Sequence, residues 1–122
     1  MTTDSSILTA VGNDYGFDRV FARQLEALGR AGDVAIGIST SGNSPNVLEG
    51  IKAAKKERLT TIGLSGKDGG MLAKEADLTI TISWTSTARI QECHIAVGHL
   101  LCELTEEALA RGKIEKRGSD LA

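Results

Sequence analysis

A loop rich in hydroxyl groups is the part of this sequence best suited to chemistry. The run Ser39 to Ser44 reads STSGNS and is followed at once by Pro45; we call it the serine loop. Proline suits the first turn of a helix, and serine suits the cap before it. Hydroxyls and backbone N–H groups would therefore meet at a helix N-terminus, where the helix dipole favours an anion. We predict that this loop binds a phosphate group; the alternative is an ordinary capped connection between a strand and a helix.

Three polar side chains nearer the C-terminus could take part in proton transfer or metal binding. Gln91, His94 and His99 fall in one segment with helical spacing. The two histidines lie on different faces of such a helix, so they cannot act as a simple pair. Gln91 and His99 could approach one site if the helix is irregular or their side chains lean together. Otherwise Gln91 is a surface residue and His99 a hydrogen-bonded core histidine.

Two other polar stretches allow two readings each. Asn13 and Asp14 follow a glycine and could touch a ligand, but such residues also form turns. The run 65–70 (SGKDGG) resembles a phosphate loop in composition. It lacks the Walker spacing of two glycines, lysine and a hydroxyl residue, so we interpret it as a connecting turn.

These side chains need a scaffold, and the hydrophobic pattern predicts one. Short β-branched runs predict strands, whereas apolar residues at helical spacing predict helices. The predicted strands are 33–38, 59–64 and 78–82, and the predicted helices are 17–28, 45–57, about 71–75 and 87–111. This alternation indicates βαβ units in a parallel sheet, with the polar loops at the carboxyl ends of the strands.

Three details of this scaffold are open to test. We expect a loop over 11–15, one domain over 1–110 and a charged, frayed tail over 111–122. We also expect a sustained apolar stripe on the last helix. Its members are Ile90, Cys93, Val97, Leu100, Leu101 and Leu104.

Composition narrows the possible partners and surroundings. A net charge of -2 with dispersed basic residues argues against nucleic acid, and 3% aromatic residues leave few stacking platforms. Cys93 and Cys102 share one predicted helix and are too far apart to bridge, so we expect free thiols in a reducing compartment. Neither a bilayer-spanning run nor the pattern of a signal peptide is recognised, so the cytoplasm is the expected location. The small size suggests a partner.

Three motifs in order give the sequence a family resemblance. Thr9 to Phe17 (TAVGNDYGF), Ile38 to Val47 (ISTSGNSPNV) and Thr87 to His94 (TARIQECH) resemble the sugar isomerase, or SIS, superfamily, and within it the phosphoheptose isomerases. The likeness runs from about Thr2 to Leu109. It implies a three-layer, flavodoxin-like α/β sandwich with a parallel sheet flanked by helices. It also implies the isomerisation of sedoheptulose 7-phosphate to D-glycero-D-manno-heptose 7-phosphate, a precursor of lipopolysaccharide or other surface heptoses.

The resemblance also assigns roles to individual residues. It gives the substrate phosphate to Ser39, Thr40, Ser41 and Ser44, and the sugar to Asn13, Asp14 and Gln91. Gln91 and His99 would lie at the catalytic centre as zinc ligands, with His99 as the acid or base. Such an isomerisation needs a base to move a proton between C1 and C2, and a cation or donor to stabilise the enediolate oxygen. A cytoplasmic homotetramer is implied as well.

One part of the family pattern is not found in this sequence. It is an N-terminal segment with oligomerisation helices, the first sheet strand, a glycine-rich loop, and a His and a Glu that complete the metal and proton-transfer site. We therefore interpret the chain as truncated, or as completed by another chain. With Gln91 and His99 alone, zinc would have two protein ligands, below the usual three of a catalytic site. We expect slow turnover or none from this chain alone.

Two other functions stay open. A non-catalytic SIS module could bind a phosphosugar or a protein partner, and a degenerate fragment would fold poorly and do nothing. The presence of His99 and an intact serine loop favours the enzyme lineage over the binding relatives.

Overall fold

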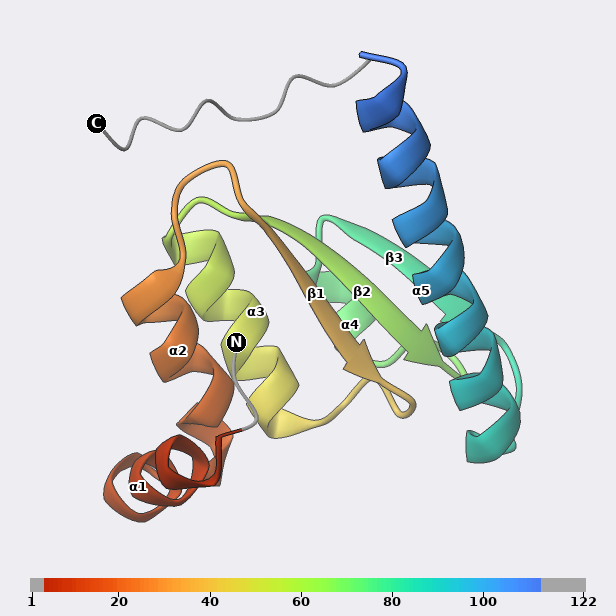
Figure 1. Cartoon of the computed structure of the whole chain (residues 1–122). Helices are drawn as coiled ribbons and strands as arrows, with labels where there is room; N and C mark the ends of the chain where they lie inside the picture. The colour runs from red at the N-terminus through yellow and green to blue at the C-terminus, as the bar shows by residue number, and fades with distance from the viewer. Residues whose placement is uncertain (1–3, 113–122) are drawn as a thin grey trace.

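The computed structural model describes residues 4–112, which form a three-stranded parallel sheet between helices (Figure 1). In chain order the elements are α1 (Ser5–Tyr15), the 3₁₀ turn η1 (Phe17–Arg19), α2 (Val20–Leu28), β1 (Val34–Ser39), α3 (Pro45–Lys56), β2 (Thr60–Gly66), α4 (Leu72–Glu75), β3 (Leu78–Ile82) and α5 (Thr87–Ala110). The strands lie in the order β1-β2-β3. The predicted α/β fold with a parallel sheet flanked by helices is confirmed.

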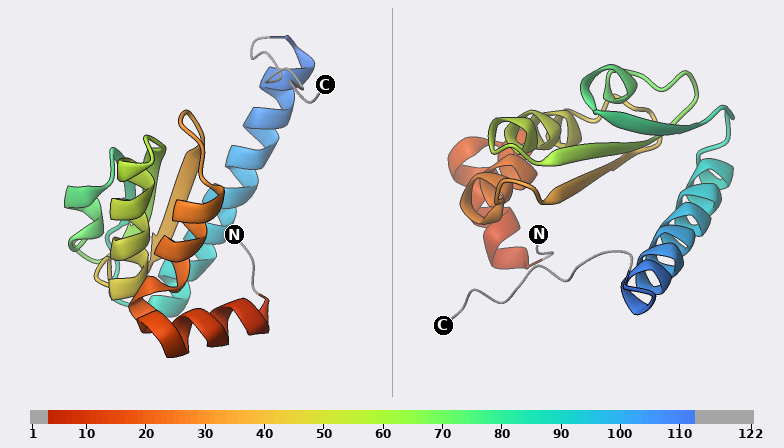
Figure 2. Two further views of the ribbon diagram at one scale, coloured as in Figure 1. Left: turned by 90° about the vertical axis from the view of Figure 1, so that its left-hand side faces the viewer. Right: turned by 90° about the horizontal axis from the view of Figure 1, so that it is seen from above.

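The helices form two unequal layers. Figure 2 shows α2, α3 and α4 on one face of the sheet and α5 alone across the other. On the first face small residues allow close packing: a Cβ placed on Gly37 of β1 would lie 3.0 Å from Cδ1 of Ile51 in α3. Because aromatic residues are scarce, the core consists of aliphatic side chains. Its largest fully buried aliphatic members are Val20, Ile51, Leu64, Leu72 and Ile90.

The loop predicted over 11–15 is wrong, because those residues form the second half of α1. Asp4 starts this helix, and its carboxylate accepts a hydrogen bond from the backbone N–H of Ile7 at 3.1 Å. Gly16, at φ 88°, ends it. The motif around Asn13 and Asp14 therefore sits on a helix and not in a turn.

The other elements agree with the prediction within a few residues. β3 has the predicted bounds, and α5 ends one residue early, at Ala110. The helix predicted over 17–28 begins as η1 before it becomes α2. Of the predicted tail, Arg111 and Gly112 form a turn, and 113–122 lie outside the described residues.

α5 packs on the sheet through a face that overlaps only partly with the predicted stripe, since Ile90 belongs to both. Its only buried residues are Ile90 and His94, whereas Leu100 and Leu104 are 52% and 54% exposed. The prediction of free thiols is confirmed, since Cys93 and Cys102 are both unpaired and exposed. Within residues 4–112, no helix has the length and apolar character needed to cross a bilayer.

Candidate functional site

The serine loop joins the carboxyl end of β1 to the first turn of α3. Ser39, the last residue of β1, is 5% exposed, and its hydroxyl hydrogen-bonds the Ser44 hydroxyl at 2.8 Å. The Ser41 hydroxyl lies 3.4 Å from the Ser39 hydroxyl and accepts a hydrogen bond from the Asn43 N–H at 3.1 Å. Three hydroxyls thus converge at one end of α3.

Ser44 occupies the N-cap position of α3, but its side chain makes no capping bond. Its hydroxyl binds Ser39 instead. The first N–H groups of a helix have no backbone partner within the helix, and the dipole there favours negative charge. In α3, Pro45 has no N–H and the Val47 N–H donates to Oδ1 of Asn46 at 2.9 Å. The hydroxyl cluster and this uncapped helix start are together the features that suit a phosphate group.

The connection between β2 and α4 packs against the serine loop and is hydrogen-bonded to it. The Leu72 N–H donates to the Gly42 carbonyl at 2.8 Å, and the Met71 N–H donates to Oδ1 of Asn43 at 2.9 Å. Gly42 has φ 68°, and a Cβ on it would lie 2.1 Å from the Gly69 carbonyl oxygen. Of the SGKDGG run, Ser65 and Gly66 end β2, and residues 67–70 lead toward α4 as predicted. Residues 69–72 also hold the shape of the serine loop.

Two basic side chains beside the start of α3 are already paired. Arg19 and Lys52 line a hollow of about 480 Å³ next to Pro45. Both donate hydrogen bonds to the Glu49 carboxylate, at 3.3 and 3.0 Å. The bond from Lys52, with a further contribution from Arg19, lowers the pKa of Glu49 against the opposing effect of burial. Arg19 and Lys52 therefore bind Glu49, and neither donates to the serine loop.

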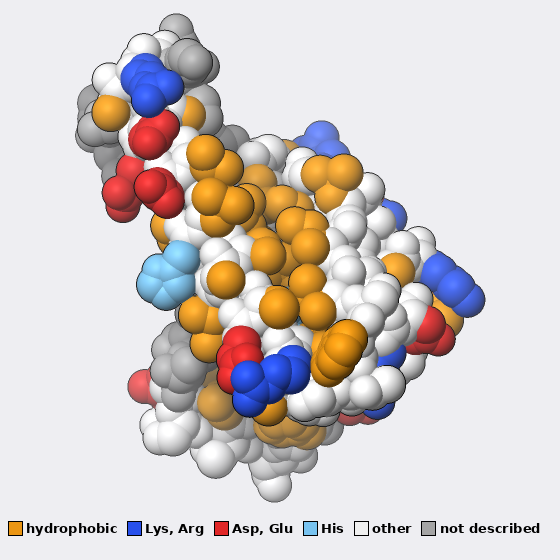
Figure 3. All heavy atoms as spheres, turned by 90° about the vertical axis from the view of Figure 1, so that its right-hand side faces the viewer, with side chains coloured by type: hydrophobic (Ala, Val, Ile, Leu, Met, Phe, Trp, Pro, Cys, Tyr) orange, Lys and Arg blue, Asp and Glu red, His pale blue; other side chains and the backbone are white. Residues whose placement is uncertain are grey.

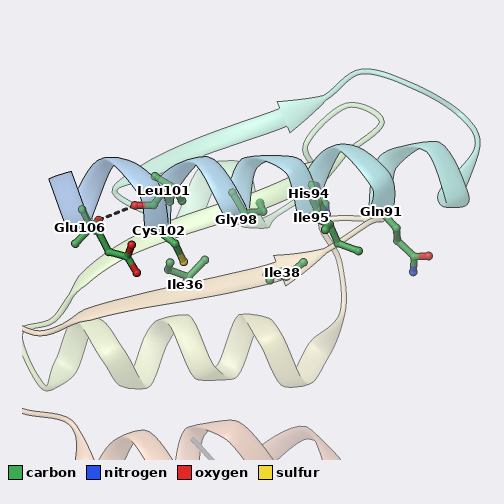
Figure 4. A pocket seen from close by; sticks show the side chains of 11 residues that line it. Ile36, Ile38, Gln91, His94, Ile95, Gly98, Leu101, Cys102 and Glu106 are labelled. Carbon is green, nitrogen blue, oxygen red and sulfur yellow. Dashed lines mark hydrogen bonds between the residues drawn. The ribbon is translucent and has the colours of Figure 1, made fainter.

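An apolar groove lies on the opposite face of the sheet, between the sheet and α5, and we call it the α5 groove. It has a volume of about 820 Å³. Its apolar lining is Ile36, Ile38, Leu64, Ile95, Leu101 and Cys102. Figure 3 shows hydrophobic side chains gathered on this face, and Figure 4 shows the side chains of β1 and α5 that line the groove.

The structure does not bring Gln91 and His99 together. Both are exposed, and α5 is an unbroken helix between them. Eight positions of a regular helix correspond to about 12 Å along the axis and a rotation of about 80°. Gln91 lines the α5 groove near Ile38, the residue before the serine loop, whereas His99 does not line it (Figure 4).

His94, and not His99, is the buried histidine of α5. It is 4% exposed, and its Nε2 lies 2.8 Å from the Ser65 carbonyl oxygen. The alternative that made His99 a core histidine is therefore wrong. Helical spacing places His94 four residues after buried Ile90, and this relation was the sequence signal that could have identified it.

Asn13 and Asp14 are exposed on α1 and bond to each other, from Nδ2 of Asn13 to Oδ1 of Asp14 at 2.9 Å. α1 lies toward the end of the molecule where α3 begins (Figure 1). No hydrogen bond within residues 4–112 links the pair to the serine loop. Their predicted contact with the sugar stays a prediction.

The residues present do not fit a zinc site. Within the described range 4–112, no three His, Cys, Asp or Glu side chains gather closely enough to hold a metal ion. Gln91 and His99 are the two ligands that the family resemblance supplies, and they are exposed at separate points of α5. A catalytic zinc site ordinarily has three protein ligands around one ion.

Comparisons with known proteins identify relatives of this chain. Phosphoheptose isomerases of Sulfurimonas denitrificans and Aquifex aeolicus are 54% and 58% identical to the chain over 109 and 107 residues. These matches cover 89% and 88% of the chain, and 56% of each relative. The chain thus spans little more than half the length of the curated relatives it matches.

Two solved structures show the same architecture. A phosphoheptose isomerase of Neisseria gonorrhoeae superposes with a TM-score of 0.82 at 53% identity, covering 84% of this chain and 58% of that one. One of Francisella tularensis gives 0.81 at 38% identity, covering 84% and 55%. A family model described as "SIS domain" matches residues 1–66, which is more than half of the 122 residues. The chain belongs to the SIS domain family.

Proposed function

We propose that this chain is a sugar-phosphate isomerase of the phosphoheptose type, which binds sedoheptulose 7-phosphate through the serine loop. The observation that carries the proposal is the convergence of the Ser39, Ser41 and Ser44 hydroxyls at the uncapped start of α3. Relatives named as phosphoheptose isomerases support the choice of substrate. The product would be D-glycero-D-manno-heptose 7-phosphate.

In this proposal some residues of the chain bind the substrate and another transfers the proton. Hydroxyls of the serine loop, including Thr40, donate to the phosphate oxygens, and the dipole of α3 offsets their charge. Asn13, Asp14 and Gln91 contact sugar hydroxyls. His99 moves a proton between C1 and C2, since an imidazole can both accept a proton and return it.

The ligands for zinc and the subunits of the proposed tetramer lie beyond what residues 4–112 contain. We propose that the active form is a homo-oligomer in the cytoplasm. Any metal site in it must draw further ligands from another subunit or from outside residues 4–112, because Gln91 and His99 of one chain are too few and too far apart.

Binding and turnover can be tested separately. Amide resonances of ¹⁵N-labelled chain are followed while sedoheptulose 7-phosphate is added, and the aldose product is measured by ¹H NMR. We expect shifts at the serine loop, with slow turnover or none. Vigorous turnover by the chain alone would contradict our assignment of an incomplete site.

A matched pair of serine variants sharpens the binding test. Ser41→Ala removes one hydroxyl from the loop, so we expect binding about ten-fold weaker, the effect of roughly 1.4 kcal/mol. Ser6→Ala removes an exposed hydroxyl from α1 and is expected to leave affinity unchanged. Equal affinities for the two variants would refute the role of the loop, and unphosphorylated sedoheptulose should cause no shifts.

A second candidate is a phosphosugar-binding module without turnover. The separation of Gln91 and His99 on α5, and the lack of a metal-binding cluster within 4–112, favour it for the chain acting alone. It predicts serine-loop binding of the same strength with no product even at high protein concentration.

A further inference from the structure

α5 is held on the sheet by very few side chains. The helix runs from Thr87 to Ala110, yet its buried residues, Ile90 and His94, both lie in the first half. The rest of the helix borders the α5 groove or faces outward. The position of α5 therefore depends on the contacts of these two residues.

Ile90 packs where β2 ends and the serine loop passes. A Cβ on Gly66 would lie 2.7 Å from Cδ1 of Ile90 and 2.5 Å from the Thr40 carbonyl oxygen. Gly66 is therefore in close contact with both α5 and the serine loop. This apolar contact fixes how near α5 approaches, but it has no directional bond to fix the rotation of the helix.

His94 supplies the directional bond. Its Nε2 lies 2.8 Å from the Ser65 carbonyl oxygen, and because a carbonyl only accepts, Nε2 carries the proton. Nδ1 is buried and has no hydrogen-bond partner among residues 4–112. Among the described residues, the imidazole therefore bonds only to Ser65, through Nε2.

Ser65 is the middle residue of a row at the carboxyl end of the sheet. It aligns with Ser39 of the serine loop on one side and with Thr81 on the other. Its hydroxyl also bonds the Thr81 hydroxyl at 2.7 Å. The bond from His94 consequently ties α5 to the strand position directly beside the serine loop.

We propose that His94 is a positioning residue, which sets the rotation of α5 so that Gln91 faces the groove beside the serine loop. Gln91 precedes His94 by three positions, about one helical turn, and lines the same groove (Figure 4). The inference rests on the proposed function, since it concerns how Gln91 meets a sugar whose phosphate the serine loop holds.

The test compares two replacements of His94. His94→Phe keeps a ring of similar size but cannot donate, whereas His94→Gln retains an N–H₂ donor near the position of Nε2. Sedoheptulose 7-phosphate is added to each ¹⁵N-labelled chain. We expect the side-chain amide shift of Gln91 to be lost in His94→Phe and restored in His94→Gln, with serine-loop shifts kept in both. Cys93→Ala, an exposed neighbour, should behave as the unaltered chain.

A Gln91 response that survives in His94→Phe would overturn the proposal. A purely structural role would instead weaken the serine-loop and Gln91 responses together. Should His94→Phe not fold, the unaltered chain still tests the bond, because its imidazole ¹⁵N spectrum must show a protonated Nε2; an Nε2 without a proton would refute the bond and the proposal with it. Absence of serine-loop shifts in the unaltered chain would refute the proposed function and leave this tautomer result intact.

Discussion

At the scale of single residues, the shape of the serine loop depends on a glycine more than on its hydroxyls. Gly42 has φ 68°, where side chains are strained, and its Cβ position is 2.1 Å from the Gly69 carbonyl oxygen. The Gly69 carbonyl belongs to the backbone, so it cannot rotate away as a side chain could. The hydroxyls can bind a phosphate only while this close contact between the two loops is kept.

Gly42→Ala is therefore expected to destabilise the protein by at least about 2 kcal/mol, because left-handed backbone strain and a backbone clash add. Gly98→Ala is the matched control. Gly98 lies within α5 with no atom within 4 Å of its Cβ position, so alanine there should stabilise by about 0.5–1 kcal/mol. Urea denaturation of the two variants measures both effects. Equal stabilities would show that the contact between the loops is not constrained.

For single residues, the sequence predicted correctly those features that depend only on neighbouring residues in the chain. Ser44 was correctly placed at the N-cap position, because serine and the following proline mark a helix start. Its bond to Ser39 rather than to the helix could not be predicted, since it depends on how the loop folds back. His94 and His99 could not be told apart without knowing which face of α5 meets the sheet.

At the scale of elements, β3 was predicted at both ends because Leu78–Ile82 is β-branched at most positions. α1 (Ser5–Tyr15) was not predicted at all, and its second half was predicted as a loop. Glycine, asparagine and aspartate at 12–14 favour turns, and here the helix begun at Asp4 overrides that preference. The stripe on α5 was right at Ile90 but not at Leu100 or Leu104, because apolar residues surround much of that helix and spacing alone does not identify the packed face.

A clamp between Thr61 and Asp77 joins the amino ends of β2 and β3. Thr61 donates through both its N–H and its hydroxyl to Oδ2 of Asp77, each at 2.8 Å, and the Asp77 N–H donates back to the Thr61 hydroxyl at 3.0 Å. The backbone and hydroxyl bonds from Thr61 lower the pKa of Asp77, with a smaller contribution from Lys55. The clamp thus favours the charged carboxylate.

A lowered pKa gives the sign of the pH dependence. The contribution of Asp77 to stability is complete above its unfolded-state pKa, about 4, and is lost as pH falls through the lower folded-state value. Asp77→Asn should therefore be less stable than the unaltered chain at pH 7, with the difference shrinking in acid. Urea denaturation from neutral pH to about pH 3 measures this. Because Glu26 and Glu49 also have lowered pKa values, only the difference between the two proteins isolates Asp77; a constant difference would contradict the assignment.

At the scale of the whole molecule, the two faces of the sheet differ in how well they are covered. α2, α3 and α4 cover one face and α5 lies alone on the other (Figure 2). Between α5 and the sheet a groove of about 820 Å³ stays open. Ile38 and Ile95, which line this groove, are 56% and 64% exposed. Contiguous apolar surface of this kind is typical of binding surfaces.

The α5 groove is therefore expected to bind a small aromatic dye. A single substitution in the groove can test whether the dye binds there. The fluorescence of 1-anilinonaphthalene-8-sulfonate should rise with the unaltered chain and fall several-fold with Ile95→Gln, which puts an amide into the groove. Leu104→Gln replaces an apolar side chain of α5 that is also more than half exposed but does not line the groove, so its fluorescence should match the unaltered chain. Because both side chains are more than half exposed, neither change should disturb folding, and circular dichroism checks this. Equal loss in the two variants would mean that the probe binds α5 generally, and that the groove is not a distinct apolar site.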